Sequence, residues 1–130
     1  LIEQIGSRAS EVAGARVVTT MHDGDAGELR ELAQGAVIRL ENPKGAAVVL
    51  GSTRGAGALI VAACSKNLVG RGVTAPLLLE PAAGAIGGRA GGKPTLGTAG
   101  GPNGGAVKEA VERLIPARLE ELLRASGTGA

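Results

Sequence analysis

The stretch AAVVLGSTRGAGALIVAAC, residues 46–64, consists of two apolar runs joined by the segment TRGAG. Two runs of strand length with glycines in the connection favour an antiparallel β-hairpin. Both runs are almost continuously apolar, which is typical of strands that other elements cover. We therefore expect this hairpin to be central to the fold, with helices on at least one face of its sheet.

The segments before the hairpin predict a strand and then a helix. ARVVTTMH, residues 15–22, is rich in β-branched residues. Asp25 is a candidate N-cap, with Glu28 three places later. The helix that follows has an apolar face made of Leu29, Leu32, Ala33, Ala36, Val37 and Leu40. Residues 1–14 predict the end of a longer helix, stopped by glycine.

The segments after the hairpin predict a basic loop over residues 65–74, a helix from Pro76 and a final helix beyond residue 105. Pro81 and Pro116 are expected to break, kink or split these two helices. The glycine-rich residues 84–105 between them predict a loop. The order of elements predicts an α/β (α+β) fold: a small mixed β-sheet with a central hairpin packed against helices, and a glycine-rich loop before the C-terminal helix.

Length and composition limit the kinds of protein this chain can be. The 130 residues suffice for one domain with a hydrophobic core, built without a single Phe, Tyr or Trp. We expect no membrane span, because no apolar run approaches 18 residues. A start at Leu1 without a signal segment suggests a fragment of a longer protein, and the lone Cys64 suggests a cytoplasmic location.

Charge is distributed unevenly along the chain. The net charge is only +2, yet residues 42–105 hold six of the cations and a single carboxylate, Glu80. A segment that is both basic and glycine-rich is a plausible binding site for a polyanion. The alternative is a solvated surface whose bias has no function.

Residues 87–93, GGRAGGK, fit the first seven positions of the phosphate-binding P-loop pattern. Pro94 stands where that pattern needs a hydroxyl for Mg²⁺. The residues after it, TLGTAGGP, cannot form the helix whose N-terminus would face the phosphates. The dinucleotide pattern G-x-G-x-x-G is also absent. We therefore expect no nucleotide site, and the glycines pack closely within the fold, allow a partner to approach, or do both.

GGRAGGKP at 87–94, followed by AGG at 99–101, resembles the signature of the C-terminal DHH-associated domain of alanyl-tRNA synthetases. Residues 48–72, with SKNL at 65–68, are similar to that family's hairpin and following segment. ARVVTT and ELRELA are similar to its preceding strand and helix. Ala90 departs from a usual glycine, and the stretch TLGT at 95–98 departs from one that often holds an acidic residue.

The resemblance implies a tRNA-binding module that contacts the elbow of an alanine-accepting tRNA and helps one tRNA serve aminoacylation and editing. It implies a parent alanine–tRNA ligase whose ATP and zinc belong to other domains. The implied boundaries are a helical linker at 1–14, which also mediates homodimer formation, a globular domain at 15–124 and a flexible tail at 125–130. The implied RNA-binding residues are Lys66, Asn67, Arg71, Gly87, Gly88, Arg89, Gly91, Gly92, Lys93, Pro94, Gly100 and Gly101.

No catalytic set emerges from the residues themselves. Cys64 lies in an apolar run and is expected to be a buried small hydrophobe, and His22 is expected to lie in a turn. We expect no catalysis, metal or cofactor in this chain. Because the chain has no aromatic rings, we expect Arg, Lys and backbone N–H groups to make the contacts with RNA. Two alternatives remain: a stand-alone nucleic-acid-binding module, or an oligomerisation module using Leu119, Leu122 and Leu123.

Overall fold

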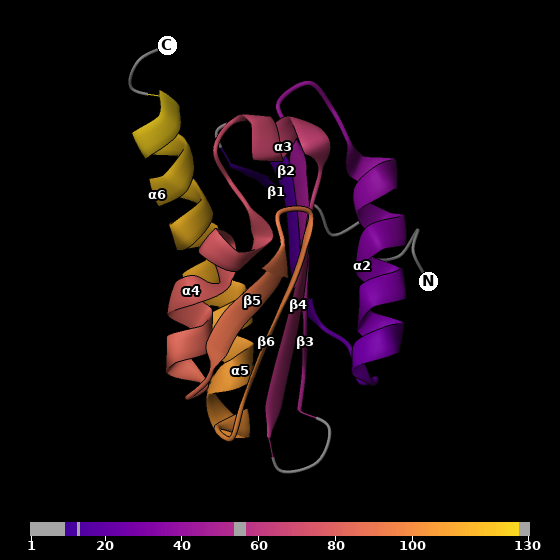
Figure 1. The fold of residues 1–130 in the computed structure, drawn as a ribbon, viewed down its shortest axis with the longest axis vertical. Coiled ribbons are helices and arrows are strands. Elements are labelled where there is room, and N and C mark those ends of the chain that lie inside the picture. The colour runs from indigo at the N-terminus through magenta and orange to yellow at the C-terminus, as the bar shows by residue number, and fades with distance from the viewer. Residues whose placement is uncertain (1–9, 13, 54–56, 128–130) are drawn as a thin grey trace.

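One six-stranded mixed sheet organises the part of the chain that the computed structural model describes, residues 10–12, 14–53 and 57–127 (Figure 1). The strand order is β1-β2-β3-β4-β6-β5. Only β2 and β3 run parallel, and the other neighbours are antiparallel. The strands are β1 Ser10–Val12, β2 Ala15–Met21, β3 Ala46–Ser52, β4 Ala58–Cys64, β5 Arg89–Lys93 and β6 Leu96–Gly101.

The central hairpin expected from residues 46–64 is confirmed as β3 and β4, paired antiparallel from Ala47 with Cys64 to Ser52 with Leu59. Every residue of β3 is buried, because helices cover both faces of this part of the sheet. The strand expected at 15–22 is confirmed as β2. The fold class predicted from the sequence, a mixed sheet packed against helices, is correct.

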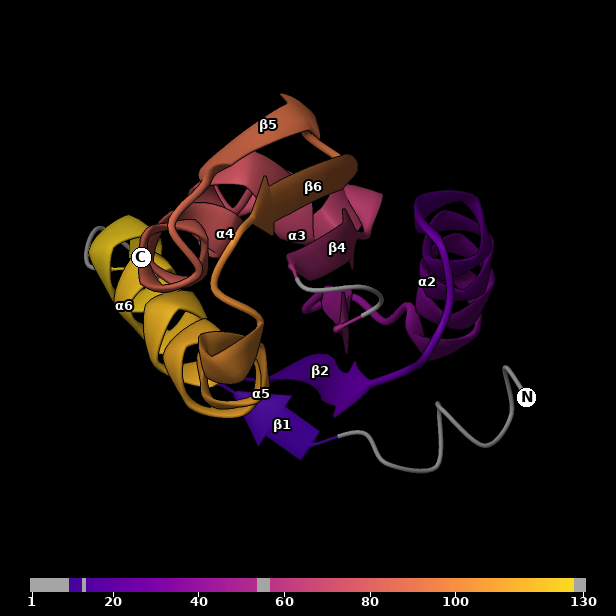
Figure 2. The same cartoon turned by 90° about the horizontal axis from the view of Figure 1, so that it is seen from below.

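Helix α2, Ala26–Leu40, covers one face of the sheet (Figure 2). Asp25 caps it as expected, since its carboxylate accepts the Glu28 N–H at 2.8 Å. The apolar face read from the sequence is buried against β3 and β4, with Leu32 half-buried at its margin. The contact joins Leu29, Ala33, Ala36, Val37 and Leu40 to Val48, Leu50, Val61 and Ala63.

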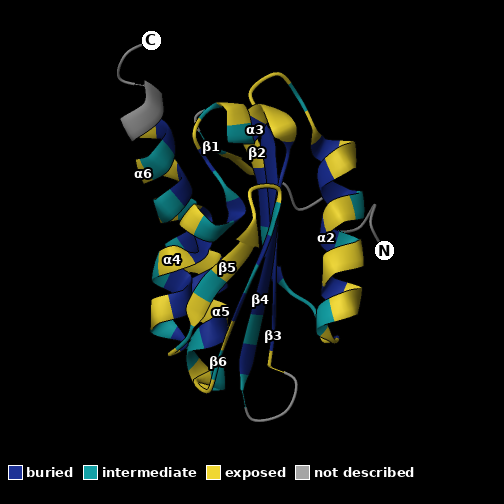
Figure 3. Cartoon of the chain, viewed as in Figure 1, coloured by how far each residue is buried: buried dark blue, intermediate teal, exposed yellow. Residues whose placement is uncertain are grey.

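Helices α4, Ala75–Ala85, and α6, Ile115–Gly127, lie on the other face, with a short α3, Lys66–Gly70, at one end of the sheet (Figure 1). A 3₁₀ turn, Gly104–Ala106, and α5, Val107–Glu109, lead towards α6. Figure 3 shows buried residues lining the inner sides of both helical layers. Leu119 and Leu123 are buried in this layer and Leu122 is half-buried, so these leucines do not form an exposed oligomerisation face.

Pro81 does not break α4, which runs as one helix from Ala75 to Ala85. Because proline has no N–H, the carbonyl of Leu77 one turn earlier has no donor within the helix. Arg118 of α6 supplies one, since its Nε donates to the Leu77 carbonyl at 3.0 Å. Arg118 also pairs with Glu80 and Glu121. The helix therefore continues through the proline because a neighbouring helix satisfies the freed carbonyl.

Pro116 does not split the last helix either. A π-helical turn, Ala110–Leu114, is separated from Pro116 only by Ile115, the first residue of α6, and joins α5 to α6. In a regular α-helix the proline ring would clash with the carbonyl four residues earlier, and the wider π turn relieves this. The helix continues to Gly127, into the segment expected to be a tail.

Three further local expectations are wrong. The glycine-rich segment is not a loop, because β5 and β6 form a second hairpin there. The segment after β4 contains helix α3, capped by Ser65, instead of a loop. Residues 10–12 form strand β1 and not the end of a helix, and residues 1–9 of that expected helix lie outside the described part of the chain. The domain boundaries stay predictions.

Candidate nucleic-acid interface

The glycine-rich hairpin is held firmly in place by its turn and its base. Pro94 and Thr95 form a two-residue connection between Lys93 and Leu96. The Pro94 carbonyl accepts the N–H of Ala75, one of the donors that the start of α4 leaves without a helical partner, at 2.8 Å. The Thr95 carbonyl accepts the N–H of Cys64 at 3.0 Å. A strand, β6, stands where a P-loop would require a helix.

The register of β5 and β6 separates this hairpin into two faces. Ala90 pairs with Ala99, and Gly92 with Gly97, on the face that packs against α4. Arg89, Gly91 and Lys93 share the other face with their cross-strand partners Gly100, Thr98 and Leu96. This second face continues the face that α2 covers. Because α2 packs mainly on β3 and β4 and its cluster reaches β6 at Leu96, it leaves the face around Arg89, Gly91 and Gly100 open (Figure 2).

The glycines of the hairpin differ in how closely other atoms surround them. A Cβ on Gly88 would lie 1.8 Å from the Gly100 carbonyl oxygen, and one on Gly101 would lie 2.2 Å from that of Ile86. Gly92 has a φ of +121° and is crowded by the Leu96 carbonyl. These three are required by the fold itself.

Gly91 and Gly100 are different. No heavy atom lies within 4 Å of a Cβ built on Gly91, and the nearest to one built on Gly100 is 3.8 Å away. Both residues are exposed on the open face. Gly87 has a φ of +78° and lies against Pro102 at the base of the hairpin, so it too is a conformational glycine.

The cations of the open face have no carboxylate partner in the part of the chain that the structure describes. Arg89 and Lys93 are exposed and form no ion pair with any described residue. By contrast, Arg113, Arg118 and Arg124 on the helical layer each pair with glutamates. The positive charge of the hairpin is therefore available to an external anion, whereas that of the helices is compensated within the fold.

The second predicted patch, Lys66, Asn67 and Arg71, lies at helix α3 and is partly engaged within the fold. Asn67 donates its side-chain N–H to the Asn42 carbonyl at 2.8 Å. Arg71 donates to the Lys44 carbonyl at 2.7 Å. Both side chains thereby anchor α3 to the loop before β3. Lys66 is exposed and forms no ion pair with a described residue.

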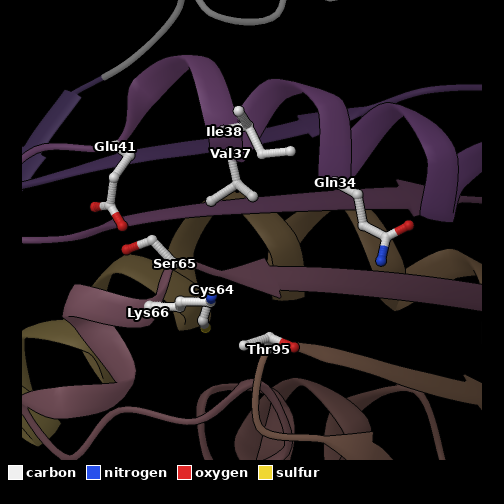
Figure 4. A pocket seen from close by; sticks show the side chains of 8 residues that line it. All are labelled: Gln34, Val37, Ile38, Glu41, Cys64, Ser65, Lys66 and Thr95. Carbon is white, nitrogen blue, oxygen red and sulfur yellow. The ribbon is translucent and has the colours of Figure 1, made fainter.

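A cavity of about 350 Å³ brings Lys66 close to the hairpin turn (Figure 4). Its lining combines one flank of α2 with the end of β4 and with Thr95 of the turn; the residues are Gln34, Val37, Ile38, Glu41, Cys64, Ser65, Lys66 and Thr95. Ile38 is 75% exposed beside it. Sequence reasoning did not find this cavity. A signal for it was present, because Ile38 is apolar but lies outside the apolar stripe of α2 that packs on the sheet.

Groups able to do acid–base or nucleophilic chemistry are not assembled at this surface. Burial raises the pKa of the Cys64 thiol to about 12, which keeps it protonated, as expected for a small buried hydrophobe. His22 follows β2 and its Nε2 lies 2.9 Å from the Glu28 carboxylate. Within residues 10–12, 14–53 and 57–127, no group of three or more His, Cys, Asp or Glu residues has metal-binding geometry.

The model of the DHHA1 domain matches residues 13–124 of this chain. The chain belongs to the DHHA1 domain family. It is 34% identical over 115 residues to an alanine–tRNA ligase of Pseudomonas syringae pv. syringae and 32% identical over 129 residues to that of Myxococcus xanthus. These matches cover 88% and 98% of this chain, but only 13% of each relative. The family resemblance seen in the sequence is confirmed.

A solved structure has the same fold. The C-Ala domain of Aquifex aeolicus alanyl-tRNA synthetase superposes with a TM-score of 0.72 at 24% identity, covering 86% of this chain and 97% of that domain. Among the described residues of this DHHA1 domain, no helix is long and apolar enough to cross a membrane.

Proposed function

We propose that this DHHA1 domain binds tRNA through the open face of its β5–β6 hairpin. The observation that carries the proposal is that Arg89 and Lys93, both without an ion-pair partner among the described residues, flank bare glycine backbone on an uncovered sheet face. Cations on such a surface contact phosphates, and exposed backbone admits close approach. Similarity to alanine–tRNA ligases supports tRNA as the RNA.

We infer that the contact is with the elbow of an alanine-accepting tRNA, where the D and T loops meet. The outermost tertiary base pair there presents a flat surface. The open face of the hairpin is itself flat between Arg89 and Lys93, because Gly91 has no side chain. A surface without aromatic rings reads shape more readily than sequence, which suits a tertiary feature common to folded tRNAs.

We further propose that the domain helps one tRNA serve the aminoacylation and editing sites of a parent alanine–tRNA ligase in the cytoplasm. In this proposal the domain itself is non-catalytic, with ATP and zinc held by other domains. The segment of residues 1–14 would contribute to a homodimer. Within this segment, residues 10–12 form strand β1.

Binding to defined RNAs tests the elbow contact. The chain is titrated with an alanine-accepting tRNA transcript, and with a minihelix of its acceptor and T stems that lacks the D loop and so has no elbow. We expect the transcript to bind at least tenfold more tightly than the minihelix, roughly the affinity carried by one or two base contacts. Equal affinity for the two RNAs would contradict the elbow assignment, and no binding to either would contradict RNA binding itself.

A further inference from the structure

We propose that Gly91 and Gly100 are recognition residues: the bound RNA, and not the fold, requires them to lack side chains. The inference rests on the proposed function and deepens it. It separates a recognition pair from the glycines that the fold requires, among them Gly88, Gly92 and Gly101. The chemical partner of the pair is a planar nucleobase surface packed on the bare backbone.

The fold gives no reason for glycine at these two positions. A Cβ on Gly91 meets nothing within 4 Å, and one on Gly100 meets only an ordinary contact at 3.8 Å to the Ala58 carbonyl. Neither residue has a positive φ. Glycine weakens the interior of a strand because it loses more conformational entropy on folding and packs no side chain. A residue with a side chain would therefore stabilise the hairpin at either position.

The placement of the pair matches a flat ligand. Arg89 is the direct cross-strand partner of Gly100, and Gly91 pairs with Thr98, so the two glycines are diagonal neighbours on one face. Arg89 and Lys93 stand on either side of Gly91 along β5, about 13 Å apart at strand spacing. A base surface can lie on the backbone between them while the two cations reach phosphates on its flanks.

A purely structural reason for bare backbone on β5 would be protection of an edge strand. Glycine-rich, charged edges discourage pairing with other chains. That reason applies to β5, which ends the sheet, but not to Gly100. Gly100 lies on β6 between β5 and β4, where no edge is exposed. The common feature of the two glycines is the open face, and not the edge.

The test uses Gly91→Val and Gly100→Ala, with Gly84→Ala as the matched control. Gly84 is exposed on α4, and a Cβ there also meets nothing within 4 Å. We expect both hairpin variants to melt at or above the temperature of the parent chain and to bind the tRNA transcript about tenfold more weakly, as for one lost base-packing contact. The salt dependence of binding should stay that of the parent, because no charge changes. The control should keep parental affinity.

Binding by Gly91→Val and Gly100→Ala equal to that of the parent would overturn the inference while leaving the proposed function intact. So would weaker apparent binding by Gly91→Val that sedimentation traces to self-association, because this is the signature of edge protection. If Gly91→Val does not fold, the fold itself requires glycine at position 91 and the inference for that residue is wrong. Gly91→Ala then measures the binding effect of a single methyl group. A parent chain that binds no tRNA would refute the proposed function first.

Discussion

Removing the two unpaired cations of the hairpin tests the electrostatic half of the proposed interface. The variant is Arg89→Ala, Lys93→Ala. In the parent chain both side chains lie on an exposed strand face and form no ion pair with the described residues. We therefore expect the free energy of unfolding to stay within about 0.5 kcal/mol of the parent value. Binding of the tRNA transcript should weaken, and its dependence on salt should become shallower.

The size of the effect follows from the spacing of the two residues. Arg89 and Lys93 are about 13 Å apart along β5, so they reach different phosphates. Each contact contributes roughly 0.7–0.9 to the slope of log K against log salt, so losing both reduces the slope by about 1.4–1.8. Between 50 and 200 mM salt, the parent should lose about tenfold more affinity than the variant.

Fluorescence anisotropy of a labelled transcript over that salt range measures both slopes. The matched control is Arg113→Ala, Arg124→Ala, which removes the same charge from exposed residues whose partners are Glu109 and Glu120. The control should keep nearly the parental slope, since these arginines lie on the helical layer away from the open face. The same loss of slope in both variants would refute the placement of the interface and indicate a general effect of net charge.

Three further predictions test the fold around this site. Gly88→Ala should lower the free energy of unfolding in urea by about 3 kcal/mol or more, because its Cβ would lie 1.8 Å from the Gly100 carbonyl oxygen; parental stability would show that the crowding is wrong. Arg118→Ala should lower the free energy of unfolding by about 1–2 kcal/mol. The loss should be much smaller in a Pro81→Ala background, because residue 81 then has an N–H that can donate to the Leu77 carbonyl. Equal losses in the two backgrounds would contradict this coupling. Burial raises the pKa of the Cys64 thiol from 9.0 to about 12. As the pH rises, the thiol therefore loses its proton in the unfolded chain before it does so in the folded chain. The free energy of unfolding should fall by up to about 4 kcal/mol between about pH 9 and 12. Chemical denaturation over that range should show a steeper decline for the parent than for Cys64→Ala.

The central part of the fold could be predicted from the sequence because its signals are local. The two apolar runs at 46–64 specify β3 and β4, and the periodic face of α2 with its Asp25 cap specifies a helix. The glycine and cation pattern of residues 87–94 sufficed to indicate the family. Each of these conclusions depends on residues close together in the chain.

Tertiary contacts decided what local preferences could not. Residues 89–101 are poor strand formers by composition, yet they pair as β5 and β6 because β4 and α4 fasten their turn through the Thr95 and Pro94 carbonyls. Pro81 is tolerated because Arg118, far away in the chain, satisfies Leu77.

The sequence by itself determined that this chain has a mixed sheet, covering helices and a basic glycine-rich segment of the DHHA1 type. The sequence could not distinguish the glycines of that segment from one another, because it does not show which atoms surround each glycine in the folded chain. Only the tertiary structure separated Gly88 and Gly101, crowded by backbone, from Gly91 and Gly100, which face open space. The physical reason is that crowding around a Cβ comes from strands and helices brought together by folding.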